Sequence, residues 1–204
     1  MLGKVPASRL RLIDGIVRAT RKLTPRALGR YAEAFIRQYY RGVADEDLVA
    51  RGPEHLAAVA LAHLEAGLTR RQGRAWVRAF NPEPARDGFA SSHTIVMLVS
   101  DDMPFLVDSM GIVLNQSGLA MHAIVHPVLP VRRDGRGRLL EIAPEASERT
   151  RLESWQMIEI DRETDPAKLA ALEDRIRAML DDVRVAVEDW QEMRRRTREL
   201  AASL

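Results

Sequence analysis

The chain has 204 residues, of which 46% are hydrophobic, 29% are charged and none is cysteine. This composition supports one sizeable core with appendages, and the lack of cysteine excludes disulfides, thiolate zinc sites and cysteine nucleophiles. No stretch reaches the roughly 20 uncharged apolar residues of a membrane span, and the first twenty residues lack the apolar segment of a signal peptide. The expected location is the cytoplasm.

The formal net charge of +2 conceals an uneven distribution of charge along the chain. Residues 1–80 carry 15 Lys and Arg against 7 Asp and Glu, whereas residues 81–204 carry 16 against 22. A basic half is compatible with an anionic partner such as nucleic acid. The basic residues are scattered singly along expected helices, with few aromatic residues nearby for base stacking. We therefore expect a solvated helical surface, and neither nucleic acid nor a membrane as partner.

Residues 1–70 are predicted to form an N-terminal region of short helices. Apolar residues recur at helical spacing in YAEAFIRQYYRGV and again in GPEHLAAVALAHLEAGL. Thr24 and Pro25 are suitable as the cap and first residue of the earlier helix. The aromatic residues of this region are interpreted as packing rather than as a ligand cage; they are Tyr31, Phe35, Tyr39 and Tyr40.

Residues 71–164 have strand-like patterns and are predicted to form an antiparallel sheet unit. RAWVRAF alternates between polar and apolar residues, and HTIVMLVS is a continuous apolar run typical of a strand buried on both faces. LAMHAIVHPVLPVRR is extended, but Pro127 and Pro130 lack an N–H donor, which indicates an edge or bulged strand. RLLEIA, after the turn DGRG, and SWQMIEIDR are the predicted strands that follow.

Residues 165–204 are predicted to form one long helix, with Asp165 as its cap and Pro166 in its first turn. Two interpretations of its apolar stripe remain, a helix packed on the sheet or a coiled-coil seam. We favour packing on the sheet because Leu180 and Val187 widen the stripe beyond a coiled-coil seam. The heptad positions are Leu169, Leu172, Ile176, Met179, Val183, Ala186, Trp190, Met193, Thr197 and Leu200.

The order of these elements predicts an α+β fold with a ferredoxin-like antiparallel sheet. Without RAWVRAF, the central unit has the order strand, helix, strand, strand, helix, which is the beginning of a split βαβ arrangement. The usual last strand is absent from this order. We expect RAWVRAF to occupy its place beside HTIVMLVS, with helices packed on the sheet.

The segment SDDMPFLVDS joins the buried strand to the helix after it. Asp101 and Asp102 are adjacent on an extended segment and point in opposite directions, which makes them a poor catalytic pair. Three histidines are candidate metal ligands, but no two have a metal-binding helix spacing; they are His93, His122 and His126. The favoured interpretation is structural, with Asp101 ending the strand and Asp102 capping the helix.

The same segment, DDMPFLVDS, resembles the D-x-P-G-L-L junction of ACT domains, ferredoxin-like modules that sense amino acids in metabolic enzymes. In that family the loop between the first strand and the first helix approaches an effector, usually at a subunit interface. The resemblance implies that the effector carboxylate binds N–H groups at the helix start. Phe105 replaces the glycine that follows the proline, and we expect its side chain to plug the pocket or to pack beneath it.

A longer resemblance covers about residues 39–193. Six blocks occur in the order of the N-terminal segment of large bacterial NAD-specific glutamate dehydrogenases: YYRGVADEDL, FNPEPARDGF, SSHTIVMLVSDDMPFLVDSM, VHPVLPVRRDGRGRL, ESWQMIEIDR and VAVEDWQEM. The resemblance implies a much longer parent enzyme that oxidatively deaminates glutamate with NAD in a downstream core. This segment has no G-x-G-x-x-G after a strand, so we predict no catalytic residue, cofactor or metal in it.

The predicted function is therefore a non-catalytic regulatory and assembly domain. Its expected partners are the remainder of the parent enzyme and its other subunits, in a homo-oligomer, and its candidate effector is an amino acid. For such an effector, the geometry of the junction suggests the backbone of Met103, Pro104, Phe105 and Leu106 for the carboxylate. It suggests Asp102 and Asn115 for the amino group, with His122 or His126 on the facing strand. The alternative is a purely structural oligomerisation module without a ligand.

Overall fold

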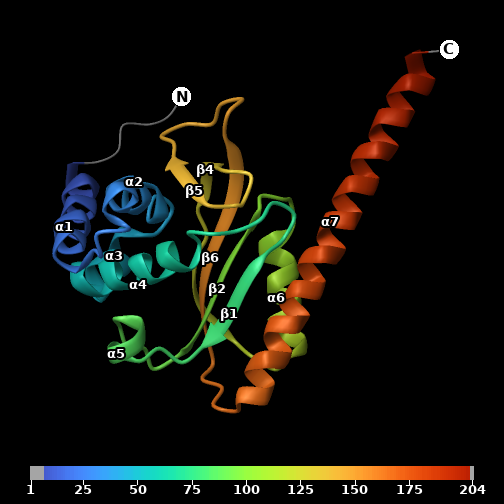
Figure 1. Cartoon of the computed structure of the whole chain (residues 1–204). Helices are drawn as coiled ribbons and strands as arrows, with labels where there is room; N and C mark the ends of the chain where they lie inside the picture. Colours follow the sequence, from blue (N-terminus) through green and yellow to red (C-terminus); the bar gives the residue numbers. More distant parts are fainter. Residues whose placement is uncertain (1–6, 203–204) are drawn as a thin grey trace.

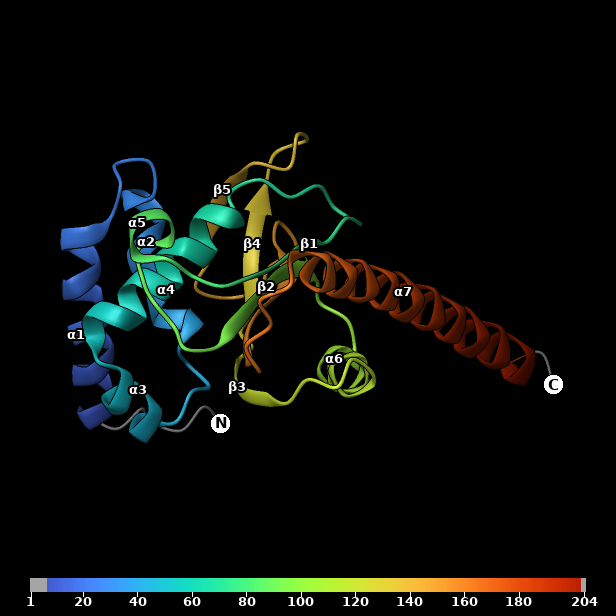
Figure 2. The same ribbon diagram turned by 90° about the horizontal axis from the view of Figure 1, so that it is seen from below.

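A six-stranded antiparallel sheet separates two groups of helices in the computed structural model, which describes residues 7–202 (Figure 1). One face carries α1 (Ala7–Leu23), α2 (Gly29–Tyr39), α3 (Asp45–Arg51) and α4 (Pro53–Ala66). The other face carries α6 (Leu106–Gln116) and α7 (Pro166–Ala202), as Figure 2 shows from below. The strands are β1 (Trp76–Phe80), β2 (Thr94–Asp101), β3 (Met121–Val125), β4 (Val128–Arg133), β5 (Leu139–Ile142) and β6 (Arg151–Ile160), and a short helix, α5 (Pro84–Asp87), lies between β1 and β2.

The strand order confirms the α+β prediction. β6 pairs with β2 along one edge, and along the other edge it pairs first with β4 and then with β3. β1 pairs antiparallel with the outer edge of β2, which is the place expected for RAWVRAF. The segment predicted as one edge or bulged strand forms two strands. β3 pairs with β6 alone and is an edge strand, whereas β4, which contains Pro130, is also covered by β5 at Val131–Arg133.

The sheet has a core on each face because side chains alternate along its strands. On the side of α1–α4, Trp155 lies edge-on to Phe35, with ring centroids 5.0 Å apart, and contacts the ring of His63. On the other side, Val96, Leu98 and Ile158 pack beneath α6 and α7. These two cores explain why HTIVMLVS has no polar alternation, because β2 is buried on both sides.

His63 is a fully buried polar group that links the helices to the sheet. Its Nδ1 accepts a hydrogen bond from the Tyr39 hydroxyl at 2.8 Å, and its Nε2–H donates to the Leu98 carbonyl at 3.1 Å. Burial lowers the pKa of His63 to about 3, with the bond to Leu98 acting in the opposite direction. The imidazole is therefore neutral at physiological pH and is an element of packing.

Helix α7 begins as predicted. Asp165 Oδ1 accepts a hydrogen bond from the Ala167 N–H at 2.8 Å, and Pro166 is the first residue of the helix. The packing of the helix on the sheet is confirmed by its buried residues, which are Leu172, Ile176, Met179, Leu180 and Val183. Val187 is partly buried against the same core, and beyond it the helix leaves the sheet, where Trp190 and Met193 are 50% and 60% exposed.

Two predicted helix caps are wrong. α2 begins at Gly29 rather than after Thr24, because the Thr24 hydroxyl donates to the Thr20 carbonyl and so belongs to the end of α1. α6 begins at Leu106 rather than after Asp102, because the Asp102 N–H still pairs with the Leu152 carbonyl beside the sheet. In both cases the predicted cap is still bonded to the preceding element, and the next helix begins further along the chain.

Gly67→Ala should destabilise the fold, because a Cβ at this position would lie 2.0 Å from Trp155 Cη2. We expect a loss of about 3 kcal/mol in the free energy of unfolding, measured by urea titration. Gly111→Ala in α6 is the matched control, since no atom lies within 4 Å of its added methyl group. It should stabilise the helix by about 0.5–1 kcal/mol. Equal effects of the two substitutions would contradict the packing described.

His63→Phe should change how stability depends on pH. The unfolded chain binds a proton at His63 below about pH 6.5, whereas the folded chain excludes it until about pH 3. As the pH decreases through that window, His63 should therefore lower the free energy of unfolding of the wild type by about 1.4 kcal/mol per pH unit. Urea titrations at pH 7.5, 6.0 and 5.0 should show this component in the wild type alone. Parallel curves for the two proteins would rule it out.

Candidate functional site

The junction between β2 and α6 is a short turn with an unusual backbone. Asp101 ends β2, as expected, and α6 starts five residues later at Leu106. Phe105, which precedes the helix, has φ 69°, in the left-handed region that favours glycine. The turn thus has a backbone conformation that suits glycine although the residue is phenylalanine.

The side chain of Phe105 neither plugs a pocket nor packs beneath one. It is 68% exposed to solvent, so both expectations for this residue are wrong. The physical reason is the left-handed backbone, which turns the side chain out while Leu106, the next residue, is buried. A large residue at positive φ is strained by roughly 1–2 kcal/mol.

The start of α6 is suited to an anionic group. Phe105 provides no side-chain cap, so the first N–H groups of the helix receive no hydrogen bond acceptor from it. The helix dipole adds partial positive charge at this end. Leu106 and Met110 anchor the helix on the sheet and fix the direction of these groups.

A buried polar cluster, made of Ser100, His126, Ser154 and Gln156, lies on the α6–α7 face of the sheet. Ser154 and Gln156 share this face with Ile158, because alternate residues of a strand point the same way. The Gln156 amide donates to Ser154 Oγ at 3.2 Å, and His126 Nε2 lies 2.8 Å from the same oxygen. Gln156 Oε1 is fully buried and accepts no hydrogen bond from any described residue.

Asp102 and His126 connect this cluster to the junction. Partial burial raises the pKa of the Asp102 carboxyl, and the attraction of His126 opposes that shift. Burial also lowers the pKa of His126, with Asp102 opposing. The two groups are therefore close enough to influence each other, and His126 is neutral at physiological pH.

The remaining candidate residues lie elsewhere. Asn115 is in the last turn of α6, about 14 Å along the helix from Leu106. His122 Nε2 lies 2.8 Å from Asp161 Oδ1, and its ring is 4.5 Å from that of His93. Within residues 7–202, no group of three or more His, Asp or Glu side chains could hold a metal ion.

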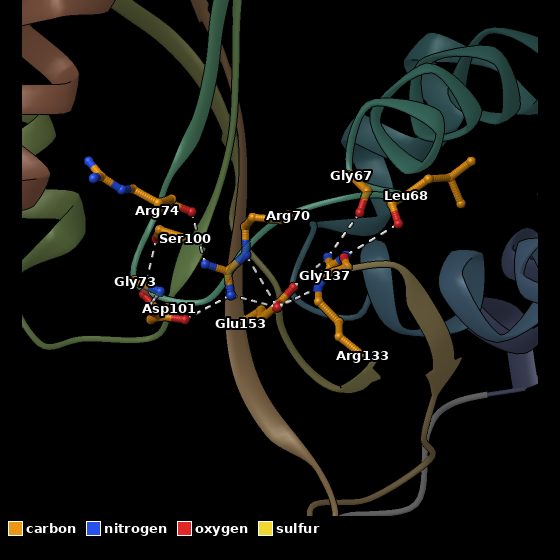
Figure 3. A network of polar contacts seen from close by, with 10 residues as sticks. All are labelled: Gly67, Leu68, Arg70, Gly73, Arg74, Ser100, Asp101, Arg133, Gly137 and Glu153. Carbon is orange, nitrogen blue, oxygen red and sulfur yellow. Dashed lines mark hydrogen bonds and ion pairs between the residues drawn. The ribbon is translucent and has the colours of Figure 1, made fainter. Parts of the chain in front are cut away.

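A buried charge network holds the end of β2 in place (Figure 3). Arg70 Nη2 donates to Glu153 Oε1 at 2.6 Å and to Asp101 Oδ1 at 2.7 Å. Arg133 donates to both oxygens of Glu153, at 2.8 and 2.9 Å, and to the carbonyl of Gly67 at 2.9 Å. Glu153 is only 1% exposed, so it binds two guanidinium groups in a nearly dry environment.

The sequence interpretation missed this network. The strand was expected to start at Ser154, whereas β6 starts at Arg151 and includes Glu153. A signal was present, because Glu153 and Glu159 occur at odd positions of a strand that also carries Trp155. Carboxylates on a buried face require cationic partners, and Arg51 does pair with Glu159.

Comparisons with known proteins identify relatives of the chain. A family model described as "Glutamate dehydrogenase, ACT1 domain" matches residues 35–176. The NAD-specific glutamate dehydrogenase of Pseudomonas aeruginosa is 41% identical over 126 residues, which is 61% of this chain and 8% of that protein. The protein of the same name from Halomonas elongata is 36% identical over 170 residues, which is 81% of this chain and 10% of that protein. The NAD-specific glutamate dehydrogenase of Mycobacterium tuberculosis is 30% identical over 131 residues, which is 63% of this chain and 8% of that protein.

Phe105→Gly should stabilise the chain by about 1 kcal/mol, because glycine adopts φ 69° without steric strain. Phe105→Ala is the control, since it removes the exposed ring but keeps the Cβ that causes the strain. We expect Phe105→Ala to change the free energy of unfolding by less than about 0.5 kcal/mol. If alanine stabilised the chain as much as glycine, the strain would not reside in the backbone at Phe105.

Proposed function

The chain belongs to the glutamate dehydrogenase ACT1 domain family, and we propose that it is the regulatory and assembly module of a large NAD-dependent glutamate dehydrogenase. The chain spans about a tenth or less of the length of the relatives it matches. The oxidative deamination of L-glutamate to 2-oxoglutarate is assigned to the remainder of such a parent protein. Its other subunits are the proposed assembly partners.

The architecture supports a non-catalytic role for this segment. Every pair of strands in the described part of the chain is antiparallel. A dinucleotide fold requires parallel strands joined by a helix and a glycine-rich turn. The β2–α6 junction contains Pro104 and Phe105 at its turn, and no glycine. These residues do not fit NAD, which we therefore assign to the rest of the parent.

The observation that carries a regulatory role is the start of α6 beside the buried polar cluster. An amino acid has a carboxylate and an ammonium group, and the junction offers a partner for each. The first N–H groups of α6 would hold the carboxylate. Asp102 and the unpaired Gln156 Oε1 would accept from the ammonium group.

A second candidate function is assembly without a ligand. The observation in its favour is a set of exposed apolar residues in the second half of α7, where Val185, Trp190 and Met193 are each at least 50% exposed. Large exposed apolar residues on one helix are typical of a contact with another protein surface. This candidate needs no pocket at the junction.

An amino-acid effector should raise the melting temperature of the chain. A ligand at about 100 times its dissociation constant adds roughly 2.7 kcal/mol of stability, which corresponds to about 5–10 °C for a chain of this length. We expect such a shift in a thermal-melt screen against the common amino acids. Gln156→Leu should abolish this shift, because the substitution removes the buried acceptor and replaces it with an apolar side chain of similar size.

Asn115→Ala is the matched control, and its shift should equal that of the wild type because Asn115 lies at the far end of α6. Loss of the shift in Asn115→Ala but not in Gln156→Leu would place the effector away from the junction. If no amino acid shifts the melt, and sedimentation shows self-association that Trp190→Glu removes, the ligand-free assembly function is supported instead.

A further inference from the structure

A basic pocket of about 430 Å³ lies between the segment that follows α4 and the strands β4 and β6. Six arginines line it: Arg70, Arg71, Arg132, Arg133, Arg149 and Arg151. The only acidic residues in the lining are Asp134 and Glu153. The lining therefore has a strong excess of positive charge, although the chain as a whole carries a net charge of only +2.

The arginines of the pocket differ in how they are neutralised. Arg70 and Arg133 form the floor and are paired with Glu153. Arg132 pairs with Glu141 at 3.1 Å near the rim. Arg71, Arg149 and Arg151 form no ion pair or side-chain hydrogen bond with any residue that the structure describes. These three are the groups that can bind an added anion.

The pocket is built on a rigid base. The Arg70 N–H donates to the Gly137 carbonyl at 2.9 Å, and the Leu139 N–H donates to the Leu68 carbonyl at 2.8 Å. These bonds tie the two walls together. Gly137 has φ 83°, and a Cβ there would lie 2.5 Å from the Arg70 carbonyl oxygen, so only glycine permits this approach. The Arg70 side chain is buried and that of Arg133 is only 9% exposed, so the floor is fixed before any ligand arrives.

The donors of the pocket indicate the chemistry of its ligand. Phosphate cradles combine cationic groups with backbone N–H groups. In the turn at the rim, the N–H groups of Arg136 and Arg138 are both occupied by Asp134 Oδ1 at 2.9 Å. No aromatic ring lines the pocket to stack on a nucleotide base. The three unpaired guanidinium groups are the charged donors of the pocket, and their planar geometry matches a carboxylate, as it also matches a phosphate.

We propose that this pocket binds a small dicarboxylate, with one carboxylate held by Arg149 and Arg151 and the other by Arg71. This site is separate from the start of α6, and the proposal does not depend on amino-acid sensing there. The two are linked physically, because Arg70 in the floor also bonds Asp101 at the end of β2. A ligand in the pocket would therefore act on the segment that leads to α6.

The test is isothermal titration calorimetry of the whole chain with glutarate, a five-carbon dicarboxylate. We expect saturable binding with one site per chain, and no saturation with acetate at the same ionic strength. The double variant Arg149→Gln/Arg151→Gln should bind at least about tenfold more weakly, since charged hydrogen bonds are lost. Both side chains are exposed, so the variant should keep the wild-type melting temperature.

Arg136→Gln is the matched control, because Arg136 is an exposed arginine of the turn at the rim of the pocket but does not line the pocket. Its affinity for glutarate should equal that of the wild type. An equal loss in Arg136→Gln would show that only the net charge matters and would overturn the site. Lack of saturation with glutarate would overturn it as well. Tighter binding of pyrophosphate than of glutarate would overturn the dicarboxylate assignment.

Discussion

The central strand β6 is the element on which the rest of the fold depends. It is paired along both edges and every residue from Glu153 to Ile160 is buried, so its two rows of side chains must each match a different environment. The odd row faces α1–α4 and combines Trp155 with two carboxylates that require arginine partners. The even row faces α6 and α7 and changes from Ile158 to the polar Gln156 and Ser154 near the junction. One strand thereby sets the positions of both sites.

Charge neutrality in the buried odd row explains how distant segments are brought together. Glu153 cannot remain ionised in an apolar setting without close cations. Two arginines donate hydrogen bonds to its carboxylate: Arg70, from the segment after α4, and Arg133, from the end of β4. Because the donors of both guanidiniums also bind backbone carbonyls, the network fixes loops as well as charges. The basic pocket is a consequence, since the same two arginines form its floor.

The sequence predicted the parts of the fold that depend on local pattern. The apolar run of β2, the capped start of α7 and the place of β1 all follow from periodicity, capping chemistry and known topology. The sequence could not predict that the side chain of Phe105 is exposed, because the left-handed backbone at this phenylalanine is imposed by the chain around it. It also missed Glu153, because the partners of a buried carboxylate lie 83 and 20 residues away in sequence. Only the folded topology brings such partners together.

Because α7 is long, a small motion of the sheet would produce a large displacement at the far end of the helix. Its first part is packed on the sheet and α6 as far as Val187, and the remainder extends away from the sheet (Figure 1). The projecting part, up to Ala202, is about 22 Å long. A helix is stiff over this length, so a tilt of about 10° at its base would displace its tip by roughly 4 Å. The domain therefore has the mechanical form of a lever, with its fulcrum on the face of the sheet that carries the junction.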